Sequence, residues 1–396
     1  MEESESSRLH MPSSERPALW ARILEIFDEI VSEAPFVRFL NKGFIILYFI
    51  LALWLGWHLL PLAENWDPAR TMSKSAQGHA VLHNYFGNFE GFAECNIRAA
   101  ELYSPPPKDD RGFYEYGAFC HDRKQLLRAL SDGGRVGFDA PYTPRGCNYR
   151  WFDVEEICFI LERFDSLIFI GDDVLHSIYG AINVLLRQDL ALGALDVSTM
   201  DQASKDNCRC VNQFVKQDCR QHFVEGAERA MQSEQAGRPY FCNRLKHAFI
   251  KVDSGNPSLV AVEKFKQLAP KAPRSRYRPI PIIHSLAPST MSTTDAATSL
   301  VKFVELADDS DRNTPMLWIG PTAAGHIELK GRKGNQEIWD YHRKMASVAE
   351  DNDVEILEMW NMTVQATSWD GMRFGEKVAI TQAMMVMNWL SRLQSS

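Results

Sequence analysis

The chain has 396 residues, 45% of them hydrophobic, which is enough to build the core of one large domain or two ordinary ones. The formal net charge of −8, with no long basic run, argues against a nucleic-acid partner. All eight cysteines lie between Cys95 and Cys242, and an even number confined to one region suits disulfides in an oxidising compartment. The pairing cannot be read from the sequence. Zinc bound by Cys208, Cys210, Cys219 and the nearby His222 is an alternative, although no standard finger spacing is present.

Residues 1–42 are predicted to form a cytosolic tail. The first 17 residues are polar and rich in serine and glutamate, which is typical of disorder. Between Ala18 and Glu33 the apolar residues recur with helical spacing opposite charged ones. We expect an amphipathic helix here that leads into a membrane, or that lies on a membrane surface or binds a partner helix.

Residues 43–62 are almost wholly apolar, and about 20 such residues cross a bilayer core as one helix. Arg22, Arg38 and Lys42 precede this segment, whereas the first basic residue after it is Arg70. The positive-inside rule therefore places the N-terminus in the cytosol. We expect a type II transmembrane signal-anchor, a lumenal C-terminal domain, and a location in the Golgi or another secretory-pathway membrane.

Residues 63–150 are predicted to be a stem and an irregular N-lobe tied by disulfides. They contain three consecutive prolines and several aromatic residues, namely Tyr103, Phe113, Tyr114, Tyr116 and Phe119. We expect this lobe to pack on the domain that follows.

Residues 151–396 show the alternation of strands and helices that predicts an α/β domain. A short apolar run, Leu167–Ile170, is followed by Gly171-Asp172-Asp173 and then by apolar residues at helical spacing. A cysteine-rich insert is expected at about 195–235. Further strands are expected near 247–252, 280–284, 316–320 and 354–359, and helices near 259–268, 295–306, 336–349 and 376–393. These repeats predict a three-layer fold with a doubly wound, mainly parallel sheet.

The Gly171-Asp172-Asp173 turn is the first candidate site, because open α/β sheets bind ligands at the carboxyl ends of their strands. A structural explanation is that Asp173 caps the helix that follows, where its charge also favours the helix dipole. Capping and function are compatible at such a turn.

The stretch around this turn resembles the first block of the GDSL/SGNH esterase superfamily, in its membrane-anchored, polysaccharide O-acetyltransferase-like branch. That block is an apolar strand, Gly-Asp-Ser and a helix, and Asp173 stands at the serine position. The last block of the family, Asp-x-x-His, resembles Asp370-Gly371-Met372-Arg373, with Arg373 at the histidine position. The resemblance covers roughly residues 150–396 and implies an SGNH-hydrolase-like domain behind one transmembrane helix.

The resemblance implies catalytic positions at Asp173, Asp370 and Arg373, no cofactor, a carbohydrate or glycolipid acceptor, and an acyl donor. A carboxylate attacking an ester would form an anhydride that still needs an activated water, and a guanidinium cannot supply that activation. Acyl transfer is therefore expected to be altered or lost. Other candidate groups of the substrate or oxyanion site are Gly171, Asp172, His176, His284, Ser285, Gly325 and His326.

Two alternatives remain open. In a pseudoenzyme that keeps the glycan cleft as a binding or scaffold site, Asp173 and Arg373 would form a salt bridge. In a Golgi glycosyltransferase, Asp172 and Asp173 would hold Mg²⁺ or Mn²⁺ and a nucleotide sugar, although no further aspartate follows two positions later.

Overall fold

The computed structural model divides the chain into two units, Met1–Lys74 and Ser75–Ser396. The residues that it describes are Tyr48, Leu51, Trp54 and 84–394, except for 116, 233–241, 243, 274–276 and 327–333. The fold and the sites below all belong to the second unit.

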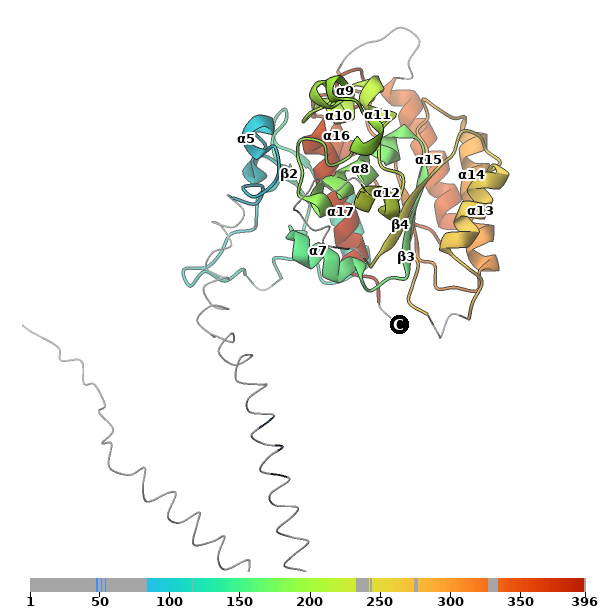
Figure 1. Ribbon diagram of the computed structural model, residues 1–396, viewed down its shortest axis with the longest axis horizontal. Helices are drawn as coiled ribbons and strands as arrows, with labels where there is room; N and C mark the ends of the chain where they lie inside the picture. The colour runs from blue at the N-terminus through green and yellow to red at the C-terminus, as the bar shows by residue number, and fades with distance from the viewer. Residues whose placement is uncertain are drawn as a thin grey trace, which may run out of the picture. The chain divides into compact units, whose positions relative to one another are not determined.

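A sheet of five parallel strands lies at the centre of this unit (Figure 1). The strands are β3 (Ser166–Gly171), β4 (Lys246–Lys251), β5 (Ile282–Ser285), β6 (Met316–Ile319) and β7 (Glu355–Leu357). Their order in the sheet is β4-β3-β5-β6-β7, so β3, the first of these five strands along the chain, lies between the second and the third. The register pairs Ile170 of β3 with Ile250 on one side and with His284 on the other.

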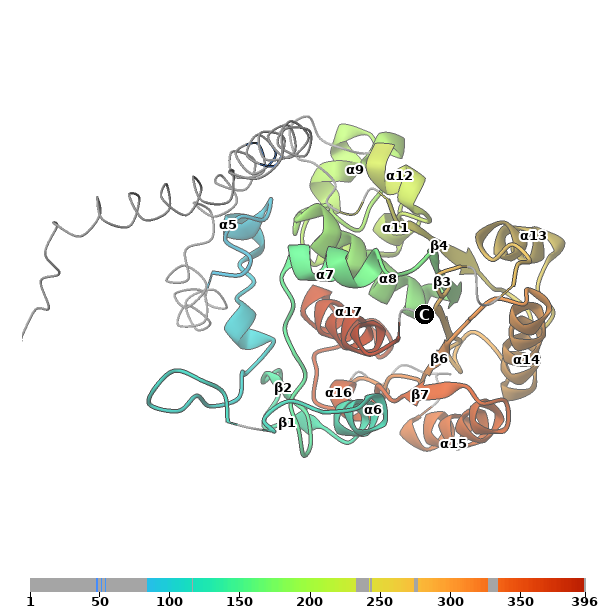
Figure 2. The ribbon, with the colours of Figure 1, turned by 90° about the horizontal axis from the view of Figure 1, so that it is seen from below.

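Helices cover both faces of the sheet, as Figure 2 shows. The helices that follow the five strands are α8 (Asp173–Arg187), α13 (Leu259–Leu268), α14 (Thr293–Asp309), α15 (Asn335–Asp351) and α17 (Glu376–Ser391). Ile168 and Ile170 of β3 belong to the core under α13, α14 and α15, whereas Leu167 and Phe169 belong to the core under α8 and α17. Alternate side chains of one strand point to opposite faces, so β3 is buried along its whole length. The predicted α/β fold with a parallel sheet flanked by helices is confirmed.

The turn after β3 is held by Asp172, which is the N-cap of α8 and accepts a hydrogen bond from the Val174 backbone N–H at 3.0 Å. The structural prediction that Asp173 is the cap is therefore wrong by one residue, because Asp173 already has helical geometry. Helix α8 ends at Arg187, and Gln188, with a φ of 49°, is its left-handed C-cap.

All eight cysteines form disulfides: Cys95–Cys210, Cys120–Cys147, Cys158–Cys242 and Cys208–Cys219. The predicted disulfides are confirmed, and the zinc alternative is wrong because its three cysteines are all oxidised. Four disulfides fit a secreted or lumenal protein.

The N-terminal lobe and the cysteine-rich insert consist of short elements. In the lobe these are α5 (Phe92–Cys95), η1 (Ala99–Glu101), α6 (Arg123–Ser131), β1 (Gly134–Arg135), β2 (Tyr142–Thr143) and, leading into the sheet, α7 (Val154–Leu161). In the insert they are η2 (Val197–Thr199), α9 (Gln202–Asn207), α10 (Asn212–Val215), α11 (Gln217–Arg220) and α12 (Ala227–Gln232). One more short helix, α16 (Trp360–Thr363), follows β7. Buried residues of the lobe, such as Phe86 and Tyr149, share one core with α8 and α17.

The predicted membrane anchor requires a correction. Within the part of the chain that the structure describes, no helix combines the length and the apolar character needed to cross a membrane. This finding contradicts the predicted transmembrane segment, type II topology and location in a Golgi or other secretory-pathway membrane. The amphipathic helix predicted at 18–33 and, apart from Tyr48, Leu51 and Trp54, residues 43–62 lie outside the described residues.

Candidate functional site

The carboxyl ends of β3 and β5 meet at Gly171, where only glycine fits. A Cβ atom at this position would lie 2.2 Å from the backbone oxygen of Ser285, its partner in the parallel register. The hydroxyl of Ser285 is itself engaged, since it donates to the carbonyl of Ile319 at 2.9 Å. Both residues therefore close the junction between the strands, and the Ser285 hydroxyl is not a free donor at this edge.

Asp172 ties this junction together and is buried. Its Oδ2 accepts hydrogen bonds from the Ala287 N–H at 2.6 Å and from the Thr290 hydroxyl at 2.5 Å, while Oδ1 accepts the Val174 N–H. Burial raises the pKa of Asp172, and these hydrogen bonds oppose the rise. A carboxylate with these three hydrogen bonds is not available to a metal ion. Among the described residues, no three His, Cys, Asp or Glu side chains are grouped so that they could hold a metal ion. The geometry therefore disfavours the metal-dependent glycosyltransferase alternative.

Asp173 begins α8 and keeps its carboxylate half-exposed. Its nearest ionic partner is Lys251, at the end of β4, with Nζ 3.9 Å from Oδ1. Its backbone carbonyl accepts a hydrogen bond from Nη2 of Arg220. Among the described residues, no histidine or arginine comes within ion-pair distance of the Asp173 carboxylate.

The segment from Asp370 to Arg373 is a turn held together by the Asp370 carboxylate. Oδ1 of Asp370 accepts the backbone N–H groups of Met372 and Arg373, and Oδ2 accepts Nε of Arg373 at 2.6 Å. Nη1 of Arg373 donates to Gln217 of the insert at 2.8 Å. Burial raises the pKa of Asp370, but these bonds outweigh burial and hold the pKa below its ordinary value. The predicted salt bridge between Asp173 and Arg373 is wrong, because each side chain has another partner.

The two segments nevertheless lie at the same edge of the sheet, on either side of Arg220. Arg220, at the end of α11, is buried and interacts electrostatically with Asp173, Arg373, Asp172 and Asp370. A cavity of about 20 Å³ lies between them. It is lined by Val174, Ser177, Arg220, Thr322, Met372, Arg373, Phe374, Ala379 and Gln382.

Two of the three candidate histidines are buried in the core. His176 stacks on Phe249 with a ring separation of 4.0 Å and has Nε2 3.2 Å from the Val224 carbonyl. His284 has Nε2 3.3 Å from the Ser299 hydroxyl, on the face covered by α14. Burial lowers the pKa of both to about 3. Both rings are therefore neutral at physiological pH and act as core residues.

The Gly325-His326 loop lies beside the Asp370 turn. The N–H of Gly325 donates to the Gly371 carbonyl at 3.0 Å, and a Cβ atom at Gly325 would lie 1.7 Å from the Ser368 hydroxyl. His326 itself is exposed and packs edge-on against Phe138, with 5.3 Å between ring centres. Of the three candidate histidines, only His326 has its loop beside the Asp370 turn.

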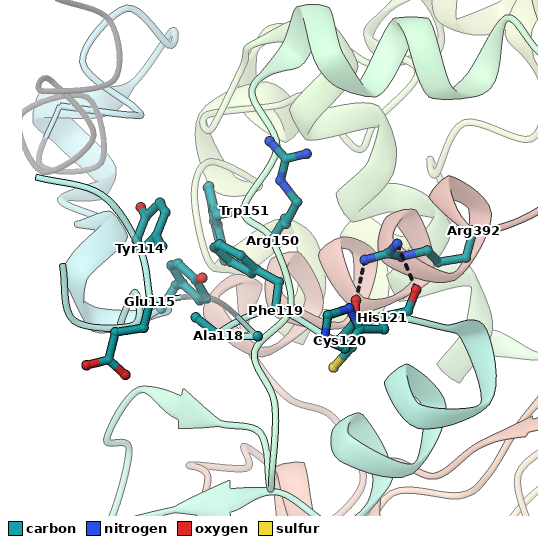
Figure 3. Close-up of a pocket in the computed structure, with 11 residues that line it drawn as sticks. Tyr114, Glu115, Ala118, Phe119, Cys120, His121, Arg150, Trp151 and Arg392 are labelled. Carbon is teal, nitrogen blue, oxygen red and sulfur yellow. Dashed lines mark hydrogen bonds between the residues drawn. The ribbon is translucent and has the colours of Figure 1, made fainter. Parts of the chain in front are cut away.

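A much larger cavity, of about 510 Å³, lies in the N-terminal lobe and was not predicted from the sequence (Figure 3). Its aromatic wall contains Tyr103, Tyr114, Phe119 and Trp151. Tyr103 stacks on Trp151 at 5.6 Å, and Tyr114 meets Phe119 edge-on at 5.0 Å. We call this space the aromatic cavity.

Charged side chains complete the aromatic cavity. Arg392, just beyond α17, donates to the backbone carbonyls of Cys120 at 2.6 Å and His121 at 3.3 Å, and so fixes one wall. Arg150 is more than half exposed and makes a 3.5 Å contact with Glu156. Glu115 also lines the cavity. The aromatic residues between 103 and 119 form a visible cluster in the sequence. That Trp151 and Arg392 line the same cavity depends on tertiary packing, so the sequence did not predict it.

The two cavities are separated by most of α17, since one is lined by Ala379 and Gln382 and the other by Arg392. Ten to 13 residues of helix correspond to roughly 15–20 Å. They are therefore distinct sites.

Comparison with known proteins identifies no family. No family model matches the chain, and no curated protein matches it. Among solved structures, an acetyl xylan esterase, AlAXEase, aligns with a TM-score of 0.30 and 7% identity over 56% of this chain and 97% of that one. A similarity at that level establishes neither a shared family nor a shared activity.

Proposed function

We propose that residues 84–394 form an SGNH-like α/β domain that binds carbohydrate and does not transfer acyl groups. The observation that carries the acyl-transfer part of the proposal is that, among the described residues, the Asp173 carboxylate forms an ion pair only with Lys251, at 3.9 Å. The strand order, with the first strand between the second and the third, is compatible with that scaffold.

Acyl transfer at Asp173 would need a second group to activate water, because attack by a carboxylate on an ester leaves an anhydride. Arg373 remains protonated and is bonded to Asp370 and Gln217. His176 and His284 are buried neutral side chains with protein partners. None of these three side chains therefore supplies the base that turnover requires, and the ring of His326 packs on Phe138.

Carbohydrate binding is supported by the aromatic cavity. Its volume of about 510 Å³ lies in the range of small-molecule sites, roughly 300–1,000 Å³. The C–H faces of a pyranose ring pack on aromatic faces, and its hydroxyl groups hydrogen-bond to charged side chains at the rim. Tyr114 and Trp151 supply the first kind of contact, and Arg150 and Glu115 supply the second.

The test is isothermal titration of the full chain with xylohexaose, mannohexaose, cellohexaose and hexa-N-acetylchitohexaose. At least one is expected to bind, and Tyr114→Ala is expected to raise its Kd about tenfold or more. The matched control is Phe113→Ala, which removes a neighbouring ring, 58% exposed, that does not line the cavity. No binding by any of the four, or an equal loss in both variants, would refute the proposal.

Turnover is tested separately with p-nitrophenyl acetate. The proposal predicts no hydrolysis above the rate of heat-denatured protein, for wild type and for Asp173→Ala. Hydrolysis by wild type that is lost in Asp173→Ala would instead establish an active carboxylate and an altered acyl-transfer enzyme.

A further inference from the structure

Arg220 is a buried cation without a close counter-ion. Its side chain is 7% exposed, and none of the described carboxylates lies within 4.0 Å of its guanidinium group. Nη2 donates to the Asp173 carbonyl and, at 3.3 Å, to the Ser177 hydroxyl. Nε is buried and has no hydrogen-bond partner. Removing a cation from water costs several kcal/mol unless a charge or a full set of hydrogen bonds compensates it.

The cavity beside Arg220 contains a second unused donor. Gln382 of α17 is 4% exposed, and its Nε2 has no hydrogen-bond partner. Both side chains line the same space of about 20 Å³, together with the hydroxyl-bearing Ser177 and Thr322 and the guanidinium of Arg373. Arg373 is already paired with Asp370 at 2.6 Å, so among the described residues the cation at this cavity without an ion pair is Arg220. The carboxylates of Asp173, Asp172 and Asp370 act on Arg220 only from beyond 4.0 Å.

The size of the cavity selects its occupant. A space of about 10–15 Å³ accommodates one water molecule, so this cavity has room for one water-sized particle and not for sulfate or phosphate. Unpartnered N–H groups, one of them on a guanidinium that lacks an ion pair, favour an anion over a water molecule. We propose that this cavity binds a single monoatomic anion, of which chloride is the natural case, between Arg220 and Gln382.

This inference does not depend on carbohydrate binding, because the aromatic cavity shares no residue with the anion cavity. The bound anion would neutralise Arg220 and hold the N-terminal turn of α8, the insert and the start of α17 together.

The test uses ³⁵Cl NMR line widths of chloride in the presence of the full chain. Wild-type protein is expected to cause excess broadening that bromide displaces. Arg220→Met is expected to abolish that broadening. The control is Arg209→Met. Arg209 belongs to the same insert as Arg220 and forms a surface ion pair with Glu94 of α5, so this variant is expected to retain the broadening.

A second variant covers the case in which Arg220→Met fails to fold by circular dichroism. Gln382→Leu keeps the cation and removes the amide, and it is expected to reduce the excess line width by half or more. In parallel, the Tm of wild type should rise by about 2 °C when chloride replaces isethionate at constant ionic strength. No excess broadening by wild type, or broadening unchanged in the folded variants, would overturn the proposal and leave water as the occupant.

Discussion

Glu376, at the first position of α17, should make the stability of the domain depend strongly on pH. Its side chain is 6% exposed, and its Oε2 is buried without a hydrogen-bond partner. Burial raises its pKa to about 8, although the nearby Lys377 acts in the opposite direction. The folded state therefore holds a neutral carboxylic acid at pH 7.

The sign and size of the effect follow from linkage. Below pH 4.5 the group is protonated in both states, and its contribution to stability is fully present. As the pH rises towards 8, the unfolded chain ionises and the folded chain does not, so stability is lost. At about 1.36 kcal/mol per pH unit, the loss between pH 5 and 8.5 is about 4 kcal/mol as an upper limit.

Glu376→Gln replaces the acid by a neutral group of the same shape, so this part of the pH dependence should disappear. Urea unfolding of both proteins at pH 5.0 and 8.5, with disulfides intact, measures the difference. The variant should gain several kcal/mol relative to wild type at the higher pH and little at the lower. Glu337→Gln, at an exposed first-turn position of α15, is the matched control. Equal pH dependence in wild type and Glu376→Gln would refute the buried-acid reasoning.

Three further predictions concern the strand edge and the core. Gly171→Ala should destabilise the domain by about 3 kcal/mol in urea unfolding, because its Cβ would approach the Ser285 backbone to 2.2 Å; Gly134→Ala, with open space around it, should cost under about 1 kcal/mol. Asp172→Asn should cost about 2 kcal/mol by the same measurement, because an amide cannot accept all three of the hydrogen bonds that this carboxylate accepts. Burial holds the pKa of His284 at about 3, so its contribution to stability, present above 6.5, is lost as the pH falls towards 3. His284→Asn should therefore reduce the loss measured between pH 7 and 5 by about 2 kcal/mol, and an unchanged slope would contradict the assignment of a neutral buried ring.

The sheet could be predicted from the sequence because each element carries its own local pattern. The strand observed at Lys246–Lys251 was expected at 247–252, and α13 has the predicted bounds of 259–268. The turn after β3 was also predictable, since a short apolar run followed by Gly171 and two aspartates marks a strand end. Such signals lie within one stretch of chain, so no tertiary information is needed to recognise them.

The side-chain arrangement at the strand edge could not be predicted in the same way. Arg220 carries no local signal, and its role depends on the Cys208–Cys219 and Cys95–Cys210 disulfides that fold the insert towards α8. The pairing of Arg373 with Asp370, and not with Asp173, follows from the turn geometry between positions 370 and 373. Competition between a near and a distant partner is decided by backbone conformation, which the family resemblance does not specify.

The insert determines how much space is left at the strand edge beside Arg220. α11 brings Gln217 to Arg373 and Arg220 to the carbonyl of Asp173, and this leaves a space of about 20 Å³ between the two segments that resemble a hydrolase site. A sugar ester is many times larger than that space. The aromatic cavity, with about 510 Å³, has the volume for a sugar, and it lies beyond the far end of α17. If the chain binds glycans, the contacts must therefore be sought in the N-terminal lobe, where a Tyr114 substitution should weaken binding and an Asp173 substitution should not.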